Sequence, residues 1–111
     1  MFKEIIKRMK KRFLKQDEIS APRFPDIVGE TQEDMIHRVL LTLGFEHDPD
    51  GRFDYHNESS VANNYVAIYQ DHLYVKIYAK AQAYTDSDSI PFPLVSAQKL
   101  ADLVIYNTYL D

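Results

Sequence analysis

The segment YVAIYQDHLYVKIYAKAQAY, residues 65–84, carries five of the chain's eight tyrosines. A tyrosine combines a large rigid ring with a hydroxyl that donates and accepts hydrogen bonds, so several tyrosines on one surface favour molecular contact. Aromatic and β-branched residues are frequent here, which is typical of strands, and alternate residues of a strand share one side. The candidate binding residues on one such side are Tyr65, Tyr69, Tyr74, Lys76, Tyr78 and Lys80.

Polar residues in the middle of this segment predict a hairpin. A two-residue turn at residues 71–72 places Tyr69 opposite Tyr74. The same register places Tyr65 opposite Tyr78. The second side of the hairpin is then aliphatic and is the natural core face. Its residues are Val66, Ile68, Val75, Ile77 and Ala79.

The tyrosine side has three interpretations. Antiparallel sheets often leave one face in solvent, so the rings can be a purely structural surface. The rings also suit recognition of another protein or of a second copy of this chain, and the edge strand after Tyr78 can serve the same purpose. Aromatic strands with interleaved lysines also stack the unpaired bases of RNA or single-stranded DNA. We rank a protein partner above nucleic acid because the body of the chain is acidic.

The four histidines raise the question of a metal site. They are His37, His47, His56 and His72. His47 and His56 fall on neighbouring strands of a predicted hairpin, with several aspartates close in sequence. However, no His-x-x-x-His spacing is present, the chain has no cysteine, and turn formation explains the aspartates. We therefore predict no metal site.

The short motifs of common catalytic sites are missing as well. The sequence has no glycine-rich phosphate loop, nucleophile elbow or HExxH motif, and its three glycines leave little room for close backbone approach to a cofactor. The seventeen Asp and Glu side chains are explained as solubilising charge. We predict a non-enzymatic protein without a cofactor or a small-molecule substrate.

Positive charge is concentrated in residues 1–16, MFKEIIKRMKKRFLKQ. This segment has a net charge of +6, whereas the remainder of the chain has a net charge of −10. Its apolar residues recur at helical spacing, which predicts an amphipathic helix with a cationic back. The cations are Lys3, Lys7, Arg8, Lys10, Lys11, Arg12 and Lys15.

Three uses of this basic helix stay open. It can pack on the body or on another subunit, lie on an anionic membrane surface, or bind the phosphates of nucleic acid. No apolar run approaches the length of about eighteen residues that a membrane span needs, and charged residues stand where a signal peptide has its apolar core. We expect a cytoplasmic protein, with peripheral membrane association through residues 1–16 as an alternative.

Two further helices are predicted from local signals. Thr31 is a typical N-cap ahead of an apolar periodic run, and Gly44 supplies a left-handed end to that run. A helix is therefore predicted over residues 31–43. Ser96 caps a final helix, in which apolar residues again recur at helical spacing.

Residues 45–55, FEHDPDGRFDY, predict a second hairpin. An Asp-Pro-Asp turn followed by a left-handed Gly51 pairs Asp48 with Arg52. That register places four rings on one face, those of Phe45, His47, Phe53 and Tyr55. The following NESSVANN, residues 57–64, reads as a polar connection, and TDSDS, residues 85–89, reads as an acidic loop.

The order of these elements predicts an α+β fold. A small antiparallel sheet of about four strands, formed by two hairpins, packs against helices at both ends of the chain. The length and apolar content are sufficient for one domain, which we assign to residues 31–111. The basic amphipathic helix of residues 1–16 precedes it, and residues 17–30, which include two prolines, form the linker.

Overall fold

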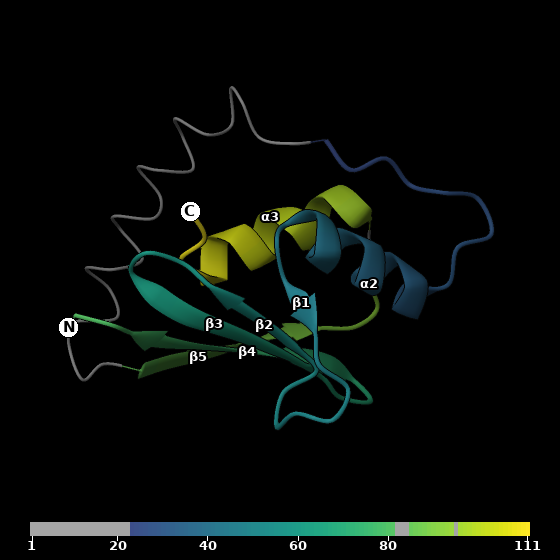
Figure 1. The fold of residues 1–111 in the computed structure, drawn as a ribbon. Helices are drawn as coiled ribbons and strands as arrows, with labels where there is room; N and C mark the ends of the chain where they lie inside the picture. Colours follow the sequence, from purple (N-terminus) through teal and green to yellow (C-terminus); the bar gives the residue numbers. More distant parts are fainter. Residues whose placement is uncertain (1–22, 82–84, 95) are drawn as a thin grey trace.

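The computed structural model describes residues 23–81, 85–94 and 96–111. The basic helix predicted over residues 1–16 and the first part of the predicted linker lie outside this range. The described chain has an α+β fold with one five-stranded antiparallel sheet and two helices (Figure 1). The predicted fold class is confirmed, and the sheet has one strand more than the two predicted hairpins supply.

The sheet order is the same as the chain order, and every strand is antiparallel to its neighbours. Helix α2 (Gln32–Thr42) precedes the sheet and helix α3 (Ala97–Asn107) follows it. The strands are β1 (Glu46–His47), β2 (Tyr55–Glu58), β3 (Ala62–Ile68), β4 (His72–Ala79) and β5 (Thr85–Pro91). Both helices lie over the same face of the sheet (Figure 1). No helix among the described residues covers the other face.

The core lies between the two helices and the sheet. The predicted aliphatic face of β3 and β4 is the face that is buried, as Val66 and Val75 show. Residues from both helices pack against it: Ile36, Val39, Leu40, Leu100 and Val104. Because the pleat sends alternate side chains to opposite sides, this burial leaves the tyrosines on the face away from the helices.

Both predicted helix caps are present. The side chain of Thr31 accepts a hydrogen bond from the Asp34 amide at 3.1 Å, and that of Ser96 accepts one from the Lys99 amide at 3.1 Å. Each bond satisfies one of the amides that a helix start leaves without a partner. Gly44 follows α2 with a φ of 99°, the left-handed conformation that was predicted for it.

Residues just before α2 are held against the two helices. Phe24 is buried, and its amide donates to Oε1 of Gln98 on α3 at 2.9 Å. Arg38 of α2 donates to the carbonyl of Pro25 and forms a bidentate ion pair with Glu30. The described end of the predicted linker therefore contributes to the packed structure.

The β3–β4 hairpin differs from the prediction in its register. Its two-residue turn is at residues 70–71 and not at the predicted residues 71–72. The turn is closed by a hydrogen bond from the Tyr69 amide to the His72 carbonyl at 2.9 Å. As a result Tyr65 lies opposite Lys76 instead of Tyr78. The observed register places the first apolar residue of β4, Leu73, opposite Ile68 on the core side. The shift is two residues, so every side chain keeps its predicted face.

The β1–β2 hairpin has a longer loop than predicted. The pairs are Glu46 with His56 and His47 with Tyr55, and the loop is closed by a bond from the Asp48 amide to the Asp54 carbonyl. The tight turn at residues 48–51 does form, but Gly51 has no positive φ and Asp48 does not pair with Arg52. The extra length lets Phe53 leave the helix side and pack on the tyrosine side, so the prediction that it shares a face with Tyr55 was wrong.

Two segments that were predicted as connections contain strands. Residues 57–64 include the end of β2 and the start of β3, so only residues 59–61 connect these strands. Residues 85–91, predicted to begin as an acidic loop, form β5, which pairs with β4 from Tyr78 opposite Thr85 to His72 opposite Pro91. An edge strand tolerates polar side chains, and Ile90 fixes its orientation by entering the core.

Candidate binding face

The sheet face away from the helices gathers most of the candidate residues. Tyr65, Tyr74 and Tyr78 are half-buried there, and Tyr69 is 51% exposed. The sequence predicted that these four rings share a side, and the strand pairing places them there. Three further rings that the prediction did not assign to this site join them, those of Phe53, His56 and His72. We call these seven rings the aromatic face.

The rings of the aromatic face touch one another in a continuous row. The ring of His56 stacks on that of Tyr65 with centroids 4.8 Å apart and planes 20° apart. Phe53 lies 4.8 Å from Tyr65 and 6.4 Å from Tyr74. The row continues from Tyr74 to Tyr69 at 6.2 Å. Separations of this kind are typical of favourable aromatic pairs.

Two further ring contacts continue this row at its ends. At one end Tyr69 stacks on His72 with centroids 5.0 Å apart. Beside the other end Tyr78 lies edge-on to Tyr65 at 5.5 Å. Because each ring is held by a neighbour, the surface loses little side-chain freedom when a partner covers it.

The tyrosine hydroxyls of this face have no hydrogen-bond partner in the part of the chain that the structure describes. They belong to Tyr65, Tyr69, Tyr74 and Tyr78. Tyr55 provides the contrast, because it points to the helix side and its hydroxyl lies 2.7 Å from Nδ1 of His37. The unbonded hydroxyls are therefore free to bond to water or to a partner.

Two cations lie on the rings. Nζ of Lys76 is 5.2 Å from the centre of the Tyr78 ring, and the guanidinium of Arg52 is 5.7 Å from the centre of the Phe53 ring. These are cation–π distances. Neither cation has a carboxylate within ion-pair distance among the described residues. The second cation that the sequence predicted for this face, Lys80, is instead paired with Glu58.

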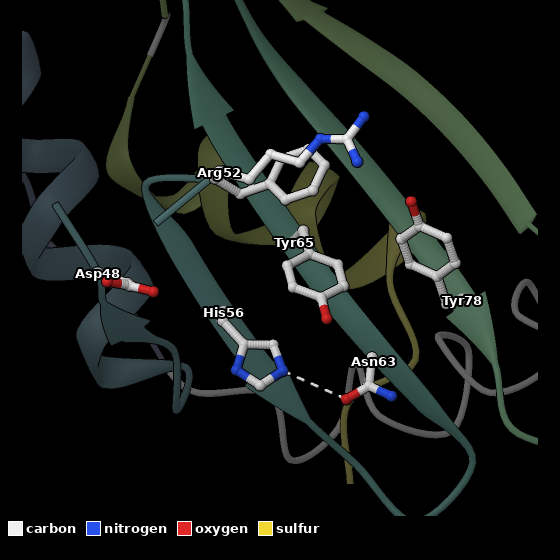
Figure 2. Close-up of a pocket in the computed structure, with 7 residues that line it drawn as sticks. Asp48, Arg52, His56, Asn63, Tyr65 and Tyr78 are labelled. Atoms are coloured by element: carbon white, nitrogen blue, oxygen red, sulfur yellow. Dashed lines mark hydrogen bonds between the residues drawn. The ribbon is translucent and has the colours of Figure 1, made fainter. Parts of the chain in front are cut away.

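A hollow of about 490 Å³ opens around Tyr65. Figure 2 shows the ring of Tyr65 between His56 and Tyr78, with Arg52 at one end and Asn63 at the other. Nε2 of His56 lies 3.2 Å from Oδ1 of Asn63. The remaining lining residues are Asp48 and Phe53. The hollow thus joins an aromatic wall to several hydrogen-bonding groups.

Five members of this site were missed by sequence reasoning: Arg52, Phe53, His56, Asn63 and His72. The signal for His56 lies in the strand pairing, because His56 is opposite Tyr65 and opposite residues share a face. Arg52 and Phe53 come from the β1–β2 loop, whose predicted register sent Phe53 to the other side. Asn63 was hidden in a segment read as a connection.

The histidines do not gather as a metal site. His47 was considered together with His56, but His47 pairs with Tyr55 and lies on the helix side, where its ring is 5.1 Å from that of His37. Nowhere in the described ranges do three His, Cys, Asp or Glu side chains come close enough to hold a metal ion.

Tyr55 lies on the helix side of the sheet, in a buried position. It is 3% exposed, and this burial raises the pKa of its hydroxyl, with smaller contributions from Asp54 and Glu33. The phenol is therefore neutral at physiological pH and can bond to His37. The contact between Tyr55 and His37 joins β2 to α2 on the opposite side of the sheet from the aromatic face.

No family model, curated protein or solved structure matches this chain. Among the described residues, no helix has the length and apolar character needed to cross a lipid bilayer. The cations predicted for the basic helix all fall in residues 1–16, outside the described range.

Proposed function

We propose that this protein acts by binding another protein through the aromatic face, as a small non-enzymatic adaptor or regulatory protein of the cytoplasm. One observation carries the proposal: four tyrosines lie side by side on an exposed sheet face, with hydroxyls that no described residue bonds. A fold of this kind needs only a polar surface there, and large exposed aromatic patches mark interaction sites.

The physical properties of the face support a protein partner. Tyrosine is enriched at protein interfaces because its ring offers large contact area at a small entropic cost. The rings are held by their neighbours, so the face is organised before it binds. The two cations on its rings add charge beside the apolar ring surfaces and their hydroxyl groups.

Single-stranded nucleic acid is the second candidate ligand. Arg52 and Lys76 beside stackable rings are the observation that favours it, since such surfaces combine base stacking with phosphate contacts. The net charge of −10 on residues 17–111 opposes the approach of a polyanion. We therefore place nucleic acid below protein.

Site-specific photo-crosslinking in the cells that normally make the protein tests the proposal. A benzophenone amino acid is placed at Tyr69 on the aromatic face or, as the control, at Leu41 on α2. The two side chains are similarly exposed, at 51% and 44%, so they differ mainly in the face they sample. The expected result is a discrete protein adduct from position 69 and none from position 41.

The mass and composition of the adduct separate the candidates. A product of twice the chain's own mass identifies a second copy as the partner, and a larger or smaller product identifies a different protein. A product that nuclease removes favours the second candidate. Absence of an adduct at position 69, or the same adducts from both positions, contradicts the proposal.

A further inference from the structure

We infer that the partner contributes a short segment with one or two carboxylates among apolar or aromatic side chains, and that Arg52 and Lys76 receive these carboxylates. This inference rests on the proposed function and specifies the chemistry of the partner. It is carried by the two cations on the rings, which have no carboxylate within ion-pair distance in residues 23–81, 85–94 and 96–111.

The distribution of charge separates this surface from the rest of the protein. Elsewhere in the described chain Arg38 is paired with Glu30. At the rim of the aromatic face Lys80 is paired with Glu58, and Oδ1 of Asp71 lies 2.6 Å from Nδ1 of His72. Arg52 and Lys76 are the cations that lie on the rings with no carboxylate of a described residue within ion-pair distance. These two cations lie among the rings of a protein whose residues 17–111 carry a net charge of −10.

The hollow gives the first carboxylate a defined position. The Arg52 guanidinium stands at one end, and its planar fork of donors matches the two oxygens of a carboxylate. The hydroxyl of Tyr78 lies at the same side of the hollow in Figure 2 and can donate a further hydrogen bond. An apolar or aromatic neighbour in the same segment can then contact the ring of Tyr65.

The lining also contains one carboxylate, that of Asp48. It folds over its own turn, where a Cβ added at Gly51 would collide with it. Asp48 and Arg52 form no ion pair. Asp48 and the acidic body both disfavour a ligand with many negative charges. The preferred segment therefore has few carboxylates, unlike a nucleic acid, which carries one charge per nucleotide.

A second copy of the chain fits this chemistry poorly. In a symmetric dimer the same face meets itself, so Arg52 and Lys76 need carboxylates from the same face of the partner copy. Of the carboxylates near that face, Glu58 is paired with Lys80, Asp71 lies against His72 and Asp48 is folded over its turn. Glu46, opposite His56 on the edge strand β1, is the exposed carboxylate that a second copy could offer from this face of its described residues. A different protein supplies the missing charge more readily.

Selection from a random library of twelve-residue peptides displayed on phage tests the inference without assuming a sequence. The full chain is the bait, at near-physiological salt. Three variants serve as parallel baits: Arg52→Gln/Lys76→Gln, Tyr65→Ser/Tyr74→Ser, and Arg23→Gln/Lys99→Gln. The last is the matched control, because it removes the same charge from positions away from the aromatic face. Thermal unfolding verifies that each bait is folded.

The expected peptides combine aromatic or apolar residues with one or two Asp or Glu. Fluorescence anisotropy of a labelled enriched peptide should show about tenfold weaker binding to Arg52→Gln/Lys76→Gln, equivalent to about 1.4 kcal/mol, because the peptide carboxylates lose their charge-assisted hydrogen bonds. Binding to Arg23→Gln/Lys99→Gln should be unchanged. A labelled twelve-nucleotide single-stranded RNA of mixed sequence is titrated in parallel.

Each other outcome overturns the inference in a different way. Enriched peptides that lack carboxylates but still require Tyr65 and Tyr74 overturn the charge assignment and leave the proposed function standing. Failure to enrich any peptide above the Tyr65→Ser/Tyr74→Ser bait counts against both. RNA binding that is tighter than peptide binding and depends on the same tyrosines replaces the protein segment by nucleic acid.

Discussion

The side-chain amide of Asn64 exchanges two hydrogen bonds with the backbone of Tyr109. The Tyr109 amide donates to Oδ1 of Asn64 at 2.9 Å, and Nδ2 of Asn64 donates to the Tyr109 carbonyl at 3.0 Å. Asn64 is 0% exposed, in the middle strand of the sheet, and Tyr109 follows α3. One buried polar side chain therefore ties the end of the chain to the centre of the sheet.

Replacing Asn64 by alanine should lower the free energy of unfolding by about 2–3 kcal/mol, because the Tyr109 backbone groups lose their partner. Asn63→Ala is the matched control. Asn63 is the preceding residue and is half-buried on the opposite face. Asn63→Ala should therefore lower the free energy of unfolding by less than about 1 kcal/mol. Urea denaturation of the two variants measures both values. Equal losses would contradict a special role for Asn64.

The burial of Asn64 shows where sequence reasoning reaches its limit. Its partner lies 45 residues further along the chain, and nothing in NESSVANN distinguishes a buried asparagine from a solvated one. Helix α2 was predicted correctly because its signals, Thr31 and Gly44, are local and adjoin it. The face of the tyrosines was also predicted, because alternation along a strand survives a register shift of two residues.

Strand partners and loop lengths are set by tertiary packing and were predicted less well. The segment TDSDSIP has a composition typical of a loop, and it becomes β5 because β4 offers an edge and Ile90 a buried anchor. Phe53 changes sides because the β1–β2 loop that contains it is longer than the shortest loop compatible with its turn residues. The tyrosines of the site were therefore predicted from the sequence. The hollow that Arg52, His56 and Asn63 help to form was not predicted.

The contact between Tyr55 and His37 can be tested through pH. Tyr55→Phe removes a hydroxyl 2.7 Å from His37 Nδ1 and should lower the free energy of unfolding by about 1 kcal/mol at neutral pH. Burial raises the pKa of Tyr55 in the folded state. Above its ordinary pKa of about 10 the unfolded chain releases the proton first, so the wild-type protein loses stability as pH rises.

The difference in the free energy of unfolding between wild type and Tyr55→Phe should therefore become smaller above about pH 10. Chemical denaturation at neutral pH and at several alkaline values measures it. A gap that widens with pH would mean that the folded state favours the phenolate, contrary to the burial of this side chain.

The ion pair of Glu30 with Arg38 predicts a loss of stability at acid pH, whereas Tyr55 predicts a loss at alkaline pH. Two hydrogen bonds of 2.8 Å from Arg38 lower the pKa of Glu30 in the folded state. The stabilisation is therefore complete above the unfolded pKa of Glu, about 4.3, and is lost as pH falls through the lower folded value. Glu30→Gln should be less stable than wild type at pH 7, and the two should converge in acid.

Urea denaturation from pH 7 into the acid range checks this prediction. Glu33→Gln is a control, since Glu33 is an exposed carboxylate of the first turn of α2. If the difference between wild type and Glu30→Gln did not change with pH, the ion pair would contribute nothing through charge.

The aromatic face should contribute more to binding than to folding. Tyr69 and Leu73 belong to the same hairpin but point to opposite faces, and they are 51% and 0% exposed. Leu73→Ala leaves a cavity in the core and should cost about 2–5 kcal/mol of unfolding free energy. Tyr69→Ser removes mainly an exposed ring and should cost less than about 1 kcal/mol, since single cross-strand contacts contribute little. Urea denaturation measures both costs, and a titration with the enriched peptide measures binding to Tyr69→Ser.

A cost for Tyr69→Ser that approaches that of Leu73→Ala would show that the rings are needed to hold the sheet together. Retained stability with weakened binding is what a recognition surface requires.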